Sequence, residues 1–306
     1  MDGQTAPQRG LGDLMSADAK LRRLCTGATW SEGPVWIPGR DVLRWSDIPG
    51  NRILEADALT GELSVYQTDV EFTNGRTLDD SGAVIQCSHG RRAIERDVDG
   101  QTTVLVDSWN GARFNSPNDV IVARDGTIWF TDPPYGIVQP HEGHPGEREY
   151  GANYVFRFDP KSGSVHPVVT DLEEPNGLAF SPDESLLYVS DTSVALRTDG
   201  SGNHHIRVYR VRDGACSDGR VFAVIDPGVS DGFRVDEHGN IWTSSDDSVQ
   251  VYSPDGERIG VIPVPERIGN LCFGGSAGRT LFIAATTSIY TIETTVRDAR
   301  AVRVTS

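Results

Sequence analysis

The sequence predicts an all-β protein, a six-bladed β-propeller with a metal at the axial tunnel. The 306 residues contain 33 Gly and 17 Pro with short apolar runs between them, a composition typical of short strands joined by turns. One strand pattern recurs six times at spacings of about 40 to 60 residues, the size of a four-stranded blade. Oxygen-bearing side chains also recur beside Gly or Pro, one or two repeats apart. A β-sandwich is the alternative, but it need not repeat one unit six times.

The recurring strand is the clearest element of the repeat. It is expected at residues 42–47, 83–88, 127–132, 186–191, 240–245 and 280–285. Turn signals such as Asp125-Gly126 and His238-Gly239 precede most of these runs. A second strand and another turn follow most of them, as at residues 154–158 and 249–252. The repeat predicts a single domain over residues 1–306, with about the first 20 residues as an N-terminal extension.

The charge balance limits the partners of the chain. Lys plus Arg is 28 and Asp plus Glu is 44, so the net charge is −16. An acidic surface argues against nucleic acid and anionic membranes as partners, and it suits a protein that attracts cations. Solubility alone is the other interpretation of this charge.

The cysteines and the apolar runs indicate the compartment. The four cysteines are far apart and form no C-x-x-C pair, so no disulfide framework is expected, and Cys87 and Cys272 are expected to be buried thiols. No apolar run approaches the length of a membrane span, and the N-terminus has no apolar signal core. We therefore expect a cytoplasmic protein.

Four positions carry the chemistry that the sequence predicts: Glu32, Asn118, Asn176 and Asp231. Asn-Gly and Asp-Gly pairs commonly form turns, which is the structural alternative for Asn176 and Asp231 taken singly. Glu32 stands in an apolar setting, where a carboxylate needs a partner or a metal. A radial repeat would bring all four to the axis, where two carboxylates and two amide oxygens form a hard ligand set that suits calcium. An open-sided cation of this kind is a hydrolytic centre.

Several stretches resemble one family, that of gluconolactonase, senescence marker protein (regucalcin) and luciferin-regenerating enzyme, and in particular its bacterial sugar-lactonase branch. The similar stretches cover most of residues 25–290 and are Ser31-Glu32-Gly33-Pro34-Val35-Trp36, Phe114-Asn115-Ser116-Pro117-Asn118-Asp119-Val120, Thr131-Asp132-Pro133-Pro134-Tyr135-Gly136, Pro175-Asn176-Gly177-Leu178-Ala179-Phe180 and Asp231-Gly232-Phe233-Arg234-Val235-Asp236. The resemblance implies a six-bladed propeller that binds one divalent metal through Glu32, Asn118, Asn176 and Asp231. Calcium is the first choice, with zinc, magnesium and manganese as alternatives.

The resemblance also implies an activity, the metal-dependent hydrolysis of a sugar lactone such as glucono-1,5-lactone to the aldonic acid. Asp231 is expected to be the general base, with His89 or a nearby carboxylate as the alternative. Arg113, Asn115, Asn118 and Tyr135 are the expected substrate contacts. Second-layer carboxylates are expected at Asp119, Asp132 and Asp191, although the last two could equally cap turns.

The segment 135–151 is too polar and too rich in Gly and Pro for regular structure, and residues 137–150 within it are expected to act as a lid that selects among lactones. His141 and His144 within it do not have the spacing of a zinc motif. The alternative functions are a phosphotriesterase or another lactonase on the same scaffold, a calcium-binding regulator, and an interaction propeller. The expected partner is a small-molecule lactone, and the expected oligomeric state is a monomer or a small homo-oligomer.

Overall fold

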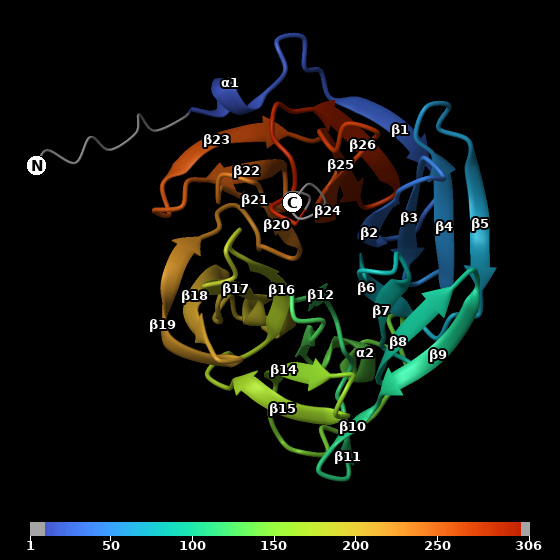
Figure 1. The fold of residues 1–306 in the computed structure, drawn as a ribbon, viewed down its shortest axis with the longest axis vertical. Helices are drawn as coiled ribbons and strands as arrows, with labels where there is room; N and C mark the ends of the chain where they lie inside the picture. Colours follow the sequence, from blue (N-terminus) through green and yellow to red (C-terminus); the bar gives the residue numbers. More distant parts are fainter. Residues whose placement is uncertain (1–9, 301–306) are drawn as a thin grey trace, which may run out of the picture.

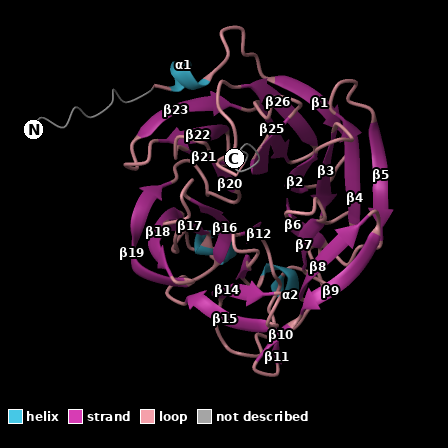
Figure 2. Ribbon diagram, viewed as in Figure 1, coloured by secondary structure: helices cyan, strands magenta, loops and turns pink. Residues whose placement is uncertain are grey.

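The computed structural model describes residues 10–300. These residues form six four-stranded antiparallel sheets arranged radially around one axis, which confirms the predicted all-β, six-bladed propeller (Figure 1). Helical structure is limited to short segments at the edges of the blades and in loops (Figure 2). Within these residues, no helix is long and apolar enough to cross a membrane.

The blades follow one another along the chain, each running from an inner to an outer strand. Blades 1 to 3 are β2 (Ser31–Ile37), β3 (Val42–Asp47), β4 (Arg52–Asp57) and β5 (Leu63–Thr68); β6 (Thr73–Leu78), β7 (Val84–Ser88), β8 (Ala93–Val98) and β9 (Gln101–Val106); and β12 (Val120–Val122), β13 (Ile128–Asp132), β14 (Tyr154–Asp159) and β15 (Ser164–Val169). Blades 4 and 5 are β16 (Pro175–Phe180), β17 (Leu186–Asp191), β18 (His205–Arg212) and β19 (Ala215–Val224); and β20 (Phe233–Val235), β21 (Ile241–Thr243), β22 (Ser248–Tyr252) and β23 (Arg258–Pro263). Blade 6 is β24 (Ile268–Gly274), β25 (Thr280–Ala285), β26 (Ser288–Glu293) and β1 (Arg22–Thr26). The remaining elements are α1 (Leu11–Leu14), the hairpin of β10 (Ser108–Trp109) and β11 (Ala112–Arg113), α2 (Tyr135–Val138) and a 3-10 helix (Ser193–Leu196).

The recurring strand of the sequence is the second strand of every blade: β3, β7, β13, β17, β21 and β25. It is apolar because it lies in the middle of a sheet that is covered on both faces by neighbouring blades. Trp45, Trp129 and Trp242 occupy this strand in blades 1, 3 and 5 and are buried. All four cysteines are free, and Cys87 and Cys272 are buried, as predicted.

The ring closes where the N-terminal strand completes the last blade. β1 pairs antiparallel with β26, so the outermost strand of blade 6 comes from the start of the chain. α1 lies just before it, and Leu14 at the end of α1 is buried in the core cluster between blades 5 and 6. The predicted N-terminal extension is therefore part of the packed structure from α1 onward, and its first nine residues lie outside the described residues.

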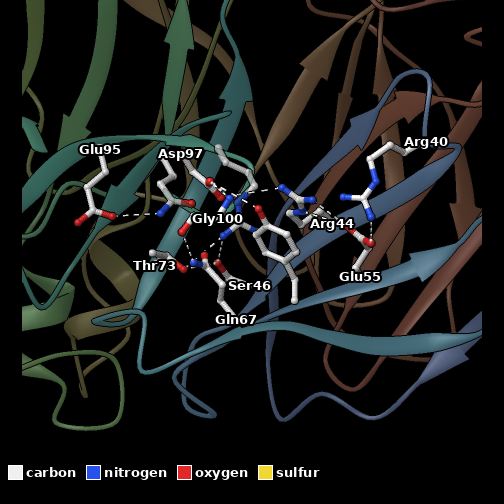
Figure 3. A network of polar contacts seen from close by, with 12 residues as sticks. Arg40, Arg44, Ser46, Glu55, Gln67, Thr73, Glu95, Asp97 and Gly100 are labelled. Carbon is white, nitrogen blue, oxygen red and sulfur yellow. Dashed lines mark hydrogen bonds and ion pairs between the residues drawn. The ribbon is translucent and has the colours of Figure 1, made fainter. Parts of the chain in front are cut away.

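A polar interface joins blades 1 and 2 (Figure 3). Arg44 of β3 donates to Glu55 of β4 at 2.7 Å, and Arg40 donates to the other oxygen of Glu55 at 3.0 Å. Arg44 also lies 3.9 Å from Asp97 of β8 in the next blade. Buried charges are costly unless they are paired, so this network favours one alignment of the two blades.

The C-terminal segment covers one end of the axial tunnel. The inner strands begin at the opposite end and finish here. Ala299 donates from its backbone to the carbonyl of Val235 in blade 5, and Arg300 donates to Thr77 in blade 2 at 2.8 Å. The segment therefore crosses the axis and leaves the beginnings of the inner strands as the end where a site can form (Figure 1).

Candidate active site

A pocket of about 410 Å³ lies at the beginnings of the inner strands. Glu32, Asn118, Asn176 and Asp231 all line it, together with Asn74 of blade 2. The structure thus brings together the four residues that the sequence predicted as metal ligands. They come from blades 1, 3, 4 and 5, which are separate in sequence and adjacent only around the axis.

Local irregularities in the inner strands lie beside Glu32 and Asn176, and also beside Asn74 and Asn270 of blades 2 and 6. In four blades the pairing of the first and second strands shifts register at the axial end, which is the pattern of a β-bulge. The shifts lie between Glu32 and Val35, Thr73 and Arg76, Pro175 and Leu178, and Ile268 and Asn270. A bulge re-aims a side chain that regular alternation would leave facing the neighbouring blade.

The glycines that follow Glu32, Asn176 and Asp231 permit close contact between neighbouring blades, whereas Asn118 is followed by Asp119. The backbone N–H of Gly177 donates to the carbonyl of Asp231 at 2.9 Å, and a Cβ at Gly177 would lie 2.5 Å from that oxygen. A Cβ at Gly232 would lie 2.0 Å from Asn270. The structural alternative for Asn176, a turn at Asn176-Gly177, does not hold, because Asn176 lies within β16. The glycine is needed for space at the crowded axis, where the six inner strands converge.

Aspartates at the ends of the second strands hold the loops that lead into three of the predicted ligands. Asp47 accepts from the backbone of Thr29 and Trp30, ahead of Glu32. Asp132 and Asp191 take the same role for the loops ahead of Asn118 and Asn176, where each accepts two backbone N–H groups from that loop. Asp132 and Asp191 are therefore caps, and the loops that they cap lead into Asn118 and Asn176.

Asp119, the other expected second-layer carboxylate, lies behind Asn118 and is buried. It accepts from the N–H of Val120 at 2.9 Å and lies 3.7 Å from the guanidinium of Arg234.

Ionisation of the two carboxylates of the axial set, those of Glu32 and Asp231, is unfavourable because both are buried. Burial, with the nearby charge of Asp231, raises the pKa of Glu32 well above its usual range. Burial raises the pKa of Asp231 to about 6. Oε2 of Glu32 accepts from the N–H of Gly33 at 3.0 Å, whereas Oε1 has no hydrogen-bond partner among residues 10–300. An unpartnered buried oxygen beside a second carboxylate fits a bound cation, which would offset both charges.

The chemistry of this set is that of a hard-oxygen site. Residues 10–300 contain no group of three or more His, Cys, Asp and Glu side chains that could hold a metal. The axial set has only two carboxylates, and its other two members are amides. Thr192 accepts a hydrogen bond from Nδ2 of Asn176 at 3.1 Å and so restrains that amide. Such a set of oxygen ligands is typical of calcium sites, whereas structural zinc sites typically have thiolate and imidazole ligands.

Two asparagines that were not among the predicted residues also belong to this site. Asn74 lines the pocket from β6. Asn270 in β24 directs its amide nitrogen toward the carboxylates of Glu32 and Asp119, while its oxygen accepts from the N–H of Leu271 at 2.8 Å. The pair Asn74-Gly75 repeats the pattern of Asn176-Gly177 and was a usable signal for blade 2.

Tyr135, one of the expected substrate contacts, lines the pocket. Its hydroxyl group lies 2.5 Å from Oγ1 of Thr192, the group that also accepts from Asn176. Tyr135 therefore braces one of the amides from the wall of the pocket.

Arg113 and Asn115 are not brought to the pocket. Arg113 is exposed on β11, and its guanidinium donates to the carbonyl of Arg91. Asn115 is buried, and its amide donates to the backbone of Asp132 and of Ala152. The amide of Asn115 is used to join two loops, which leaves it away from the axial site.

His89 lies one layer behind the pocket, and both of its ring nitrogens are engaged. Nδ1 lies 2.9 Å from the carbonyl oxygen of Glu142, and Nε2 lies 3.3 Å from Nδ2 of Asn74. Burial lowers the pKa of His89 to about 4, so the ring is neutral near pH 7. The structure therefore separates His89 from the pocket by the amide of Asn74.

The loop after α2 covers one side of the pocket. Gln139, His141 and Glu142 line it, so this part of the predicted lid lies at the ligand end of the tunnel. Burial and, to a smaller extent, the charge of Asp231 raise the pKa of Glu142 to about 7. The same loop also contacts the segment just before β6 of blade 2, where Nε2 of His144 lies 2.9 Å from a carboxylate oxygen of Glu71.

Comparison with known proteins places this chain among lactonases. Residues 30–287 match the SMP-30/Gluconolactonase/LRE-like region. A gluconolactonase of Zymomonas mobilis is 31% identical over 93% of this chain and 84% of its own length. The solved structure of a gluconolactonase from Xanthomonas campestris superposes with a TM-score of 0.85 at 42% identity, over 93% of this chain and 92% of the other. A 6-deoxy-6-sulfogluconolactonase of Pseudomonas putida is 29% identical over 83% of this chain and 82% of its own length.

Proposed function

The chain belongs to the SMP-30/gluconolactonase/LRE-like family, and we propose that it hydrolyses a sugar lactone such as glucono-1,5-lactone to the aldonic acid. The observation that carries the proposal is the convergence of Glu32, Asn118, Asn176 and Asp231 on one pocket. Relatives named as lactonases that align over most of the chain support the same reaction class.

A divalent cation would be held by the same four residues. The unpartnered Oε1 of Glu32 and the two mutually repelling carboxylates support this assignment, with calcium first and zinc, magnesium or manganese as alternatives. When bound, such a cation would supply Lewis-acid polarisation of the lactone carbonyl.

Asp231 is the proposed general base. It lines the pocket, and its backbone N–H is held by the hydroxyl of Ser244 at 2.9 Å, which limits its movement. An ionised carboxylate can hold the cation with one oxygen and accept a proton from water with the other. Asp231 takes a proton from water as the water oxygen bonds to the carbonyl carbon. The ring C–O bond then breaks, and a proton passes to the ring oxygen to give the open-chain acid.

The pocket walls supply binding. Tyr135 and Trp30 offer aromatic surface to the sugar ring, and Asn74 offers an amide to its hydroxyl groups. His89 then acts as a positioning residue, because it holds Asn74 from behind.

A panel of aldonolactones tests the proposal. The purified protein is stripped with a chelator and reloaded separately with calcium, zinc, magnesium or manganese. We expect turnover to fall to the spontaneous rate on chelation and to return with at least one metal. Turnover that survives chelation would contradict the metal assignment, and the absence of lactone turnover with every metal would contradict the activity. A phosphotriester in the same panel tests the alternative reaction on this scaffold.

A further inference from the structure

The carboxylate of Glu142 faces the pocket without a hydrogen-bond partner. It lines the same pocket as the axial residues, and its side chain is 19% exposed. No group within residues 10–300 donates a hydrogen bond to it, and the nearest ion-pair partner is the imidazole of His141 at 3.7 Å. A carboxylate offers two acceptor oxygens, and these remain available to a ligand in the pocket.

The backbone around Glu142 is held in place, so the position of this carboxylate is built into the fold. The carbonyl of Glu142 accepts from the buried His89, and its N–H donates to the carbonyl of Gln139 at 3.0 Å. The next residue, Gly143, packs so closely on Gly136 that a Cβ would lie 2.2 Å from the Gly136 carbonyl oxygen.

Among the charged groups of residues 10–300 that line the pocket, the carboxylate of Glu142 is the one without a compensating cation. A bound divalent cation would balance Glu32 and Asp231. Arg267, which also lines the pocket, is paired with Asp246 at 3.1 Å. Burial is the larger cause that raises the pKa of Glu142 to about 7, and a cation on Asp231 would offset the smaller one, the charge of Asp231, and so favour the ionised carboxylate.

We propose that Glu142 accepts hydrogen bonds from substrate hydroxyl groups and repels anionic substituents, so that the substrates are neutral, hydroxyl-rich sugar lactones. This inference rests on the proposed lactonase function and adds the charge class of the substrate. Family membership alone does not decide that class, because the Pseudomonas putida relative is named for a sulfonated lactone. A carboxylate without a compensating positive charge favours substrates that donate hydrogen bonds to it and disfavours substrates with an anionic group near it.

The test compares Glu142→Gln with the matched control Glu147→Gln. Glu147 lies in the same loop and is exposed, so the control removes the same charge away from the pocket. Initial rates are measured on glucono-1,5-lactone and on its 6-phosphate, with the spontaneous rate subtracted. We expect Glu142→Gln to lower the ratio of kcat/KM for the neutral over the phosphorylated lactone by about 10- to 100-fold, the range for a hydrogen bond to a charged group. Glu147→Gln should leave this ratio unchanged.

A general-base role for Glu142 would lower both rates together and leave the ratio as in the wild type, which would overturn the proposal. A wild-type preference for the phosphorylated lactone would also overturn it.

A binding measurement separates this inference from the activity. Calorimetric titration of the calcium-loaded protein with glucitol and with glucitol 6-phosphate needs no turnover. We expect the wild type to bind glucitol at least about tenfold more tightly, and Glu142→Gln to remove most of that preference. If no lactone is hydrolysed but this preference holds, the proposed activity fails and the ligand class stands. Equal affinities in the wild type, no glucitol binding, or the same preference in Glu142→Gln would overturn the inference.

Discussion

Nδ1 of His89 donates a hydrogen bond to the carbonyl oxygen of Glu142 across 2.9 Å. Because a carbonyl only accepts, this contact places the proton of the neutral ring on Nδ1 and leaves Nε2 to accept from Asn74. One buried side chain thus joins the covering loop to the inner strand of blade 2. Its role is to hold two walls of the pocket at a set separation.

The first prediction concerns stability and pH. The pKa of His89 in the folded protein is about 4, below the ordinary 6.5. As pH falls through this interval the unfolded chain takes up a proton that the folded protein does not, so folding stability decreases with falling pH by about 3 kcal/mol at most. His89→Gln should lack this contribution. Denaturant unfolding of both proteins between pH 4 and pH 7 checks it, and parallel pH profiles would contradict it.

The second prediction concerns the general base. Asp231→Asn preserves shape and an oxygen atom, but an amide does not accept the proton from water. We expect kcat to fall by about 100- to 10,000-fold with the fold retained. Asp255→Asn, an exposed site in the β22–β23 turn of the same blade, is the control and should keep full activity. Near-native turnover of metal-loaded Asp231→Asn would leave Asp231 as a ligand only, with the base elsewhere.

The third prediction concerns Asn270, which supports the axial carboxylates from blade 6. Asn270→Ala removes the amide directed at Glu32 and Asp119. Loss of such an orienting group typically weakens metal affinity by about 10- to 100-fold. Calorimetric titration with calcium measures the affinity. Activity should recover at saturating metal, and a defect that persists there would show that the substitution damages the fold.

The fourth prediction concerns the covering loop. A methyl group at Gly143 would meet the carbonyl of Gly136 at 2.2 Å, so Gly143→Ala should move the loop away from the pocket. We expect kcat/KM to fall by up to about 100-fold and the order of preference among lactones to change, because a misplacement of about 1 Å is enough for such a loss. The melting temperature should change little, since the loop lies outside the blades.

Gly146→Ala is the control for the loop prediction, because its added methyl group meets only side-chain atoms, of Ile137 at 3.3 Å and of Arg92 at 3.5 Å. If Gly143→Ala and wild type share one lactone profile, the loop is a passive surface segment. That result would also remove the basis for lactone selection by residues 137–150.

Much of the fold was readable from the repeat. The second strand of each blade has a strong local signal, because it is buried on both faces and must be apolar, as Trp45, Trp129 and Trp242 show. Glu32, Asn118, Asn176 and Asp231 were recognisable as a set because each stands beside Gly, Pro or Asp at repeat spacing. Arg113 and Asn115 were expected to contact the substrate because of the family resemblance just before Asn118, but the loop that carries them turns both away from the axis.

The sequence by itself determined the number of blades, through the periodic placement of apolar runs, and four of the positions that line the axial pocket, through oxygen-bearing side chains beside Gly or Pro one or two repeats apart. Only the tertiary structure decided which polar groups meet there. Asn270 and Glu142 reach the site from blade 6 and from an irregular loop, and neither position has a periodic signal. Their roles depend on contacts between distant segments, such as His89 with Glu142, and long-range packing of this kind leaves no local pattern in the chain.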